Sequence, residues 1–127
     1  MNNLNIDEKY QQLLQKHSET ESKLKTVLEN TSEGIVILDT NLTYTFWNKA
    51  EEKLTDIKKE EVLGKTVEEA FPGFEKTDFY KMYQRILKSG KPEEMTADFT
   101  LPNGKTKTYL DRVYPYGDGL IMFVQVV

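Results

Sequence analysis

The sequence predicts an α+β domain with one antiparallel sheet, and three observations support this fold class. A segment free of Gly and Pro, and rich in Glu, Lys, Gln and Leu, opens the chain and favours a helix. Two short runs of β-branched and aromatic residues follow it, and three longer runs end the chain. Tight-turn sequences join the runs at each end of the chain, so neighbouring strands are expected to pair antiparallel.

The opening helix is expected over Ile6–Asn30. Tyr10, His17 and Leu24 fall seven residues apart, which is a short heptad-like pattern with an interruption near its middle. The other apolar positions are Ile6, Leu13, Leu14, Val27 and Leu28. Two interpretations stay open: an amphipathic helix that lies on its own domain, and a two-chain coiled coil. Both hold if the first half pairs with a partner chain while the second half covers the outer face of the sheet.

The first strand, expected over residues 34–38, carries apolar side chains on both of its faces. Val36 and Leu38 point to one side, and Ile35 and Ile37 point to the other. A hairpin with one solvated face would alternate apolar and polar residues. We therefore expect each face of the sheet to be covered by other elements.

Turn-forming and helix-ending residues divide the rest of the chain into short elements. The expected order is a turn at 39–41, a strand at 43–47, short helices over 49–74, a helix at 79–89, and strands at 93–101, 105–116 and 120–127. Asn48 and Asp78 occupy helix N-cap positions. Gly64 and Gly90 suit helix C-termini, because glycine adopts the left-handed conformation there without strain.

Length and composition limit the function classes. At 127 residues the chain is expected to form one domain, with an N-terminal helix at 1–30 and a globular part at 31–127. A net charge of −4 with interspersed signs argues against nucleic acid or an anionic membrane as the main partner. Cysteine is absent, which fits a reducing compartment, and no apolar run reaches the ~18 residues that span a bilayer. We expect a soluble cytoplasmic module.

Enzyme chemistry is not expected. His17 is the single histidine, it lies on the opening helix, and cysteine is absent, so no Ser-His or Cys-His nucleophilic pair can form inside the domain. The 21 acidic residues are expected to be solvated, and no pair of them stands out. Gly117 and Gly119 belong to a turn rather than to a phosphate-binding loop. No metal site is expected, since thiolate ligands are absent and the one histidine lies outside the domain.

Three stretches of the chain carry a family resemblance: LENTSEGIVILDTNLTYTFWNKAEEKLT, EEVLGKTVEEAFP and YPYGDGLIMFVQ. In this order and at these spacings, residues 28–127 resemble a PAS domain, a small sensory fold of signalling proteins. The resemblance implies a five-stranded antiparallel sheet with the strands from the chain ends at its centre and short helices packed on its inner face. It also implies a cavity between sheet and helices, and an N-terminal helix on the outer face, often within a dimer.

The cofactors known in this family can be compared with the residues present. Haem-binding members hold iron through a histidine, typically on the long helix, and residues 79–89 contain none. Flavin adducts and thioester chromophores need a cysteine, which the chain lacks. Three possibilities are left open: a non-covalent flavin, another small organic ligand, and a cavity without a ligand.

The end of the final strand departs from the family pattern. Members commonly continue this strand into an Asp-Ile/Val-Thr motif that leads to an output domain. Val126 stands at the position of that Asp. Either the connection is cut off or altered, or the module signals through its N-terminal helix.

Alternation within the family pattern predicts that Val36, Leu38, Thr45 and Trp47 point into the cavity. The candidates for the opposite walls are Phe71, Tyr83 and Ile86, with Tyr109 and Phe123 from the far strands, and Arg112 is a further candidate. Plain core packing is the simpler role for the apolar ones. Arg112 has two interpretations: inward, where it would bind a carboxylate bidentately, or outward, paired with a surface acid.

A second set of residues is expected at the dimer contact or on the outer face of the sheet. This set comprises Tyr10, Leu13, Leu14, His17, Leu24, Val27, Leu28, Ile35, Ile37, Tyr44 and Phe46. The expected function is a homodimeric sensory module that relays occupancy of its cavity to the N-terminal helix. The alternative is a constitutive dimerisation module with a filled core and no ligand.

Overall fold

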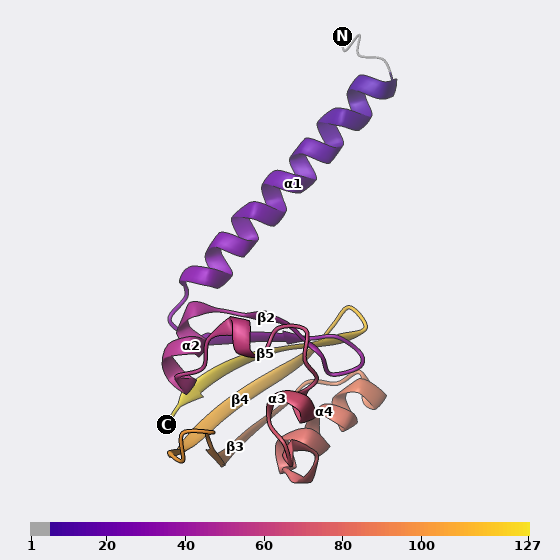
Figure 1. Ribbon diagram of the computed structural model, residues 1–127. Helices are drawn as coiled ribbons and strands as arrows, with labels where there is room; N and C mark the ends of the chain where they lie inside the picture. The colour runs from indigo at the N-terminus through magenta and orange to yellow at the C-terminus, as the bar shows by residue number, and fades with distance from the viewer. Residues whose placement is uncertain (1–5) are drawn as a thin grey trace.

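The computed structural model describes the backbone of residues 6–127, with side chains described at Gln12 and from Glu19 onward. The elements are α1 (Ile6–Asn30), β1 (Gly34–Leu38), β2 (Tyr44–Trp47), α2 (Lys49–Thr55), η1 (Lys59–Glu61), α3 (Val67–Ala70), η2 (Phe74–Lys76), α4 (Asp78–Ser89), β3 (Glu93–Thr100), β4 (Thr106–Tyr116) and β5 (Gly119–Val126). Figure 1 shows one sheet with the short helices on one side of it and α1 extending away from both. Among the described residues, no helix is both long and apolar enough to cross a membrane.

The five strands form one antiparallel sheet in the order β2-β1-β5-β4-β3. β1 and β5 come from opposite ends of the domain and pair side by side, from Gly34 opposite Val124 to Leu38 opposite Leu120. The α+β fold class predicted from the sequence is confirmed, and so is the pairing of the terminal strands.

The inner face of the sheet and the short helices enclose the hydrophobic core. Val36 and Leu38 of β1 belong to the same buried cluster as Met82 and Ile86 of α4. α4 presents one apolar stripe to this core, as its spacing predicted. Its N-cap is Thr77, whose hydroxyl accepts a hydrogen bond from the backbone of Tyr80, and not Asp78 as predicted. The remaining buried members of that stripe are Phe79 and Tyr83.

The hairpin of β1 and β2 contains a bulge that reverses two predicted orientations. Leu38 pairs with Tyr44, whereas Ile37 pairs with Phe46, so Thr45 is an extra residue on β2. One extra residue moves the side chains before it to the opposite face. Tyr44 is therefore buried in the core rather than facing outward, and Thr45 is exposed rather than facing inward. Trp47 lies beyond the bulge and faces inward as predicted.

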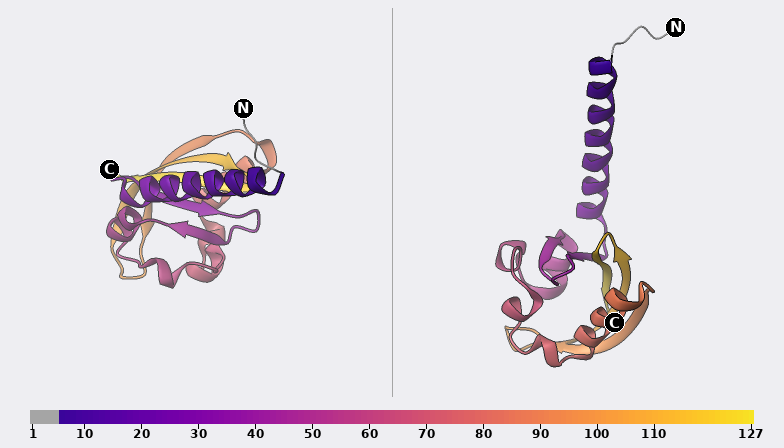
Figure 2. Two further views of the ribbon diagram at one scale, coloured as in Figure 1. Left: turned by 90° about the horizontal axis from the view of Figure 1, so that it is seen from above. Right: turned by 90° about the vertical axis from the view of Figure 1, so that its right-hand side faces the viewer.

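α1 does not lie across the sheet, which corrects its expected placement on the outer face. Its main contacts with the domain lie against α2, and its axis runs away from the sheet (Figure 2). Leu24 and Val27, which were expected at a dimer contact or on that face, are 52% and 64% exposed, and Leu28 is half-buried. The side chains of Tyr10, Leu13, Leu14 and His17 lie outside the described residues.

Asn48 fixes the C-terminal end of α1 at the edge of the sheet, and this explains its direction. Its side-chain amide donates to the carbonyl of Leu28 at 2.8 Å and to the carbonyl of Glu33 at 3.0 Å. Its side-chain oxygen accepts from the backbone of Ile35 at 2.9 Å and of Glu51 at 3.0 Å. Asn48 is the N-cap of α2, as predicted, and it also joins α2 to β1 and α1.

Part of the outer face, around β1, β2 and β5, is apolar although α1 does not cover it. Ile35 is 3% exposed, and Ile37 and Phe46 are half-buried. Phe123 lies on this face, because its ring packs edge-to-face on Tyr114 with centroids 5.9 Å apart. The predicted inward position of Phe123 is therefore wrong.

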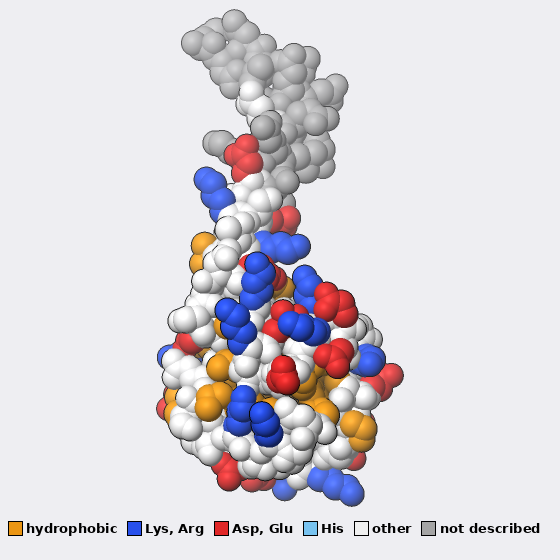
Figure 3. Space-filling model, turned by 60° about the vertical axis from the view of Figure 1, so that its left-hand side comes forward, with side chains coloured by type: hydrophobic (Ala, Val, Ile, Leu, Met, Phe, Trp, Pro, Cys, Tyr) orange, Lys and Arg blue, Asp and Glu red, His pale blue; other side chains and the backbone are white. Residues whose placement is uncertain are grey.

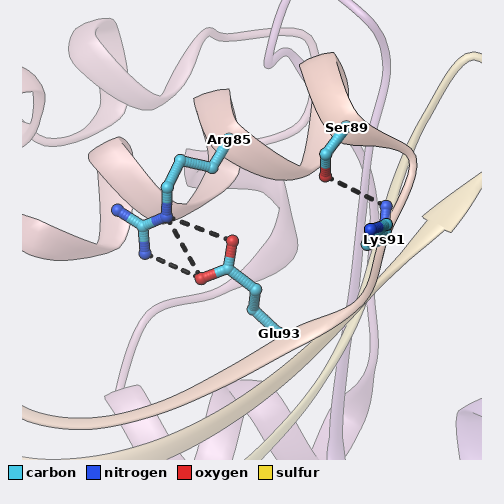
Figure 4. Close-up of polar contacts among 4 residues, drawn as sticks. All are labelled: Arg85, Ser89, Lys91 and Glu93. Carbon is cyan, nitrogen blue, oxygen red and sulfur yellow. Dashed lines mark hydrogen bonds and ion pairs between the residues drawn. The ribbon is translucent and has the colours of Figure 1, made fainter.

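A polar junction joins α4 to the first strand of the second hairpin. Arg85 of α4 donates to both carboxylate oxygens of Glu93 in β3, the shortest contact being 2.7 Å (Figure 4). These hydrogen bonds lower the pKa of Glu93. Gly90 ends the helix in the left-handed conformation, and the Ser89 hydroxyl accepts a hydrogen bond from the backbone of Lys91. This junction holds α4 beside the sheet edge, where its stripe closes the core.

Candidate functional site

A cavity of about 60 Å³ lies between the inner face of the sheet and the helices. Its lining residues are Val36, Tyr44, Trp47, Glu51, Thr55, Phe71, Phe74, Phe79, Tyr83, Phe99, Leu101, Tyr109, Asp111, Met122 and Val124. They come from all five strands, from α2, η2 and α4, and from the two segments that join α3 to η2 and β3 to β4. The cavity is therefore lined by elements from nearly the whole domain.

Aromatic rings form much of the cavity wall. Tyr44 packs edge-to-face on Trp47 with centroids 5.4 Å apart, and Phe74 stacks on Tyr83 at 5.7 Å. The indole of Trp47 donates a hydrogen bond to the carbonyl of Ile57 at 3.0 Å, which fixes the ring. Rings in such contacts give the wall a defined shape.

Glu51 contributes a buried carboxyl group to this wall. It lies in the first turn of α2, is 5% exposed, and its Oε1 has no hydrogen-bond partner among the described residues. A Cβ atom at Gly34 would lie only 2.4 Å from this oxygen, so glycine leaves the space that the carboxyl group occupies. Burial, and secondarily the charge of Asp111, raises the pKa of Glu51 to about 8.

Asp111 contributes a second buried carboxyl group, from β4. It is 7% exposed, and burial raises its pKa to about 7. A hydrogen bond from the Tyr83 hydroxyl opposes this rise. The Tyr83 hydroxyl also lies 3.2 Å from Met122 Sδ. It has one proton to donate, and the Asp111 carboxylate is a stronger acceptor than the thioether sulfur.

Three tyrosine hydroxyls accompany the two carboxyl groups. Burial raises the pKa of Tyr44 and Tyr83 well above the ordinary value and that of Tyr109 to about 12, and the nearby acids raise them further. The Tyr109 hydroxyl donates to the carbonyl of Leu54 at the end of α2, at 3.2 Å. All three tyrosines are therefore neutral hydrogen-bonding groups at physiological pH.

The structure places five of the predicted cavity residues in the wall and the other five elsewhere. Val36, Trp47, Phe71, Tyr83 and Tyr109 line the cavity. Leu38 and Ile86 are buried in the core behind it, and Thr45, Arg112 and Phe123 lie outside it.

Arg112 takes the outward of its two predicted orientations. Its guanidinium group forms an ion pair with Glu33, whose carboxylate also accepts a hydrogen bond from Gln125 at 2.8 Å. This cluster joins the residue before β1 to the middle of β4 and the end of β5. Arg112 is therefore not available to a ligand in the cavity.

Sequence reasoning missed Glu51 and Asp111, which are the two ionisable acids of the cavity. Glu51 reads as an ordinary solvated charge at the start of a helix, and nothing in its neighbours signals burial. A signal did exist for Asp111: strand alternation places it on the same face as Tyr109 and Val113, and Arg112 on the opposite one. Among the described residues, no group of three or more His, Asp or Glu could hold a metal ion.

Comparisons with known proteins agree on the fold. A family model described as the PAS fold matches residues 28–127. The LOV protein of Rhodobacter sphaeroides superposes with a TM-score of 0.72 at 15% identity, covering 87% of this chain and 68% of that one. The PAS domain of Bordetella pertussis BvgS gives 0.69 at 22% identity, covering 86% and 87%.

A third solved structure is a PAS domain from Colwellia psychrerythraea, with a TM-score of 0.72 at 15% identity, covering 85% of this chain and 97% of that one. At these identities the solved structures show a shared fold. A comparison with curated protein sequences finds no match.

Proposed function

We propose, from the premise that this chain belongs to the PAS family, that its cavity binds a small molecule and that α1 carries the response. The family is typical of sensory signal-transduction proteins. The observation that supports ligand binding is the Glu51 carboxyl group, buried in the cavity wall with Oε1 unpartnered among the described residues. A buried polar atom without a hydrogen-bond partner is costly, and a ligand that supplies the partner removes that cost.

The proposed relay runs from the cavity through α2 to α1. Glu51 is in the first turn of α2, and its backbone donates to the Asn48 side chain at 3.0 Å. The same side chain holds the carbonyl of Leu28 in the last turns of α1 at 2.8 Å. A ligand that draws the first turn of α2 toward the cavity would therefore shift the end of α1. It changes the balance of two arrangements only if it binds them with different affinity.

The partner proposed for α1 is a second copy of this chain. A 25-residue helix is ~37 Å long, and it projects from the domain with Leu24 and Val27 on one exposed face. Side chains of this kind on a projecting helix are suited to a coiled-coil contact. Figure 3 shows acidic and basic side chains interspersed over one face of the molecule, which does not suit nucleic acid or an anionic membrane as partner. The proposed location is the cytoplasm.

Replacing Leu24 and Val27 together by Glu is expected to convert the dimer to monomers, because four like charges would meet in the helix seam. Light scattering with size-exclusion chromatography measures the mass. The matched control replaces Ser22 and Thr26 by Glu, which adds the same charge on another face of α1 and should leave the dimer intact. A dimer that survives the first pair of substitutions contradicts the helix-mediated contact.

The alternative function is constitutive dimerisation without a ligand, and the small volume of the cavity favours it. Catalysis is not proposed, because the described cavity wall contains no His or Cys that could form a Ser-His or Cys-His nucleophilic pair. Native mass spectrometry of the full chain separates sensor from scaffold. A mass excess that is lost on denaturation supports the sensor, and an absorbance spectrum would identify a flavin. The mass of the bare chain under both conditions supports the scaffold instead.

A further inference from the structure

We propose that the ligand is a small organic cation, a protonated amine whose ammonium group lies between the carboxyl groups of Glu51 and Asp111. This inference rests on the proposed function, because it takes the cavity to be a ligand site. A cavity of about 60 Å³ has room for roughly four to six non-hydrogen atoms, if each needs the 10–15 Å³ that one water molecule occupies. A propylammonium ion, with four such atoms, is of this size.

The charge of the cavity wall selects for a cation. Two of its fifteen lining side chains are carboxylic acids, and none is Lys, Arg or His. The ammonium group of Lys107 is bound to the carbonyl of Leu54 at 2.7 Å, and Lys107 does not line the cavity. The acids therefore have no protein counter-ion in the described wall, and an anionic ligand would be repelled by whichever of them is ionised.

The hydrogen-bonding capacity of the wall also favours an ammonium group. An ionised carboxylate only accepts hydrogen bonds, and Glu51 Oε1 lacks a donor among the described residues. An ammonium group supplies three donors, enough for both carboxylates and a further acceptor. The faces of Tyr44, Trp47 and Tyr83 add attraction for a cation, because an aromatic ring is electron-rich over its face.

Proton linkage follows from the groups that face these carboxyl groups. Glu51 faces Asp111 and Tyr109 from β4 and Tyr44 from β2, and Asp111 faces Tyr83 from α4. With pKa values raised to about 8 and about 7, Glu51 is mostly protonated and Asp111 is about half protonated at pH 7 when the cavity has no cation. A cation binds the ionised forms, so its binding releases protons and its affinity increases with pH.

Calorimetric titration of the full chain with propylammonium at pH 6, 7 and 8 tests the inference. Two controls match the probe in size: 1-propanol is neutral and propionate is an anion. We expect propylammonium to bind at least tenfold more tightly than either control, and its affinity to rise by at least tenfold from pH 6 to pH 8. Ionisation of Asp111, with a pKa of about 7, accounts for about tenfold, and ionisation of Glu51, with a pKa of about 8, adds to it.

Glu51→Gln and Asp111→Asn keep the size of the side chain and remove its charge, so each is expected to weaken propylammonium binding at least tenfold at pH 8. Glu60→Gln removes a charge from an exposed position on η1 and should change nothing. Circular dichroism of each variant confirms folding. Equal affinity for propylammonium and 1-propanol, affinity independent of pH, or no binding of propylammonium overturns the inference. The proposed function would still stand if native mass spectrometry finds a different bound molecule.

Discussion

The free energy of unfolding of this domain is expected to fall as the pH rises from about 4.5 to about 8, and Glu51→Gln should remove much of that fall. The pKa of Glu51 is raised from 4.5 to about 8 in the folded chain. Between these values the folded chain holds a proton that the unfolded chain has lost, so raising the pH favours unfolding. The stability that the protonated Glu51 contributes is fully present below about pH 4.5, and it is lost as the pH rises through about 8.

The size of the effect follows from the shift in pKa. Each pKa unit corresponds to ~1.4 kcal/mol, so the change for Glu51 is roughly 3–5 kcal/mol. Asp111 adds to it between 3.8 and about 7, and its charge is one reason for the raised pKa of Glu51. Asp111→Asn should therefore remove the contribution of Asp111 to the pH dependence and also reduce the contribution of Glu51.

Urea denaturation at half-unit steps from pH 5 to pH 9 measures this dependence. Glu51→Gln is expected to have a flatter profile and to be more stable than the parent chain at pH 8. Glu60→Gln serves as the control, because Glu60 is exposed, and should follow the parent profile. A Glu51→Gln profile parallel to that of the parent would show that Glu51 is not buried as described.

Asn48→Ala is expected to destabilise the domain by roughly 3–5 kcal/mol. The side chain of Asn48 makes four hydrogen bonds, each contributing ~1 kcal/mol, and the substitution removes them from all four partners at once. Two of those partners, the backbone groups of Ile35 and Glu51, are buried. Chemical denaturation measures the loss. Asn41→Ala, in the exposed turn between β1 and β2, is the control and should cost less than ~0.5 kcal/mol.

Asn48→Asp tests the proposed link between α2 and α1 without unfolding the sheet. Aspartate keeps the two bonds accepted from Ile35 and Glu51, but it cannot donate to the carbonyls of Leu28 and Glu33. We expect the sheet to stay folded while amide hydrogens in the last turns of α1 exchange faster. Unchanged exchange there would contradict the role of Asn48 in holding the helix.

Much of the fold could be predicted because its signals are local. The apolar run of β1, the N-cap at Asn48 and the stripe of α4 each depend on neighbouring residues, and all three are present. The bulge at Thr45 could not be predicted, because it depends on how β2 pairs with β1 and not on the sequence of β2 alone. It reversed the predicted orientations of Tyr44 and Thr45.

The site was harder to predict because its important groups are polar. Apolar wall residues such as Val36 and Trp47 follow from alternation, whereas a buried acid looks like a solvated one in sequence. Glu51 is buried because Gly34, 17 positions earlier on β1, leaves room for its carboxyl group. The direction of α1 likewise depends on a contact between Asn48 and Leu28, which are 20 residues apart.

The titration of the Glu51 carboxyl carbon, followed by ¹³C NMR with and without saturating propylammonium, would decide whether this acid is a ligand-binding group. The expected midpoint is about 8 in the free chain, lowered by at least one pH unit when propylammonium is bound, because the cation stabilises the carboxylate. A midpoint near the ordinary glutamate value in the free chain, or one that propylammonium leaves unchanged, would contradict the assignment.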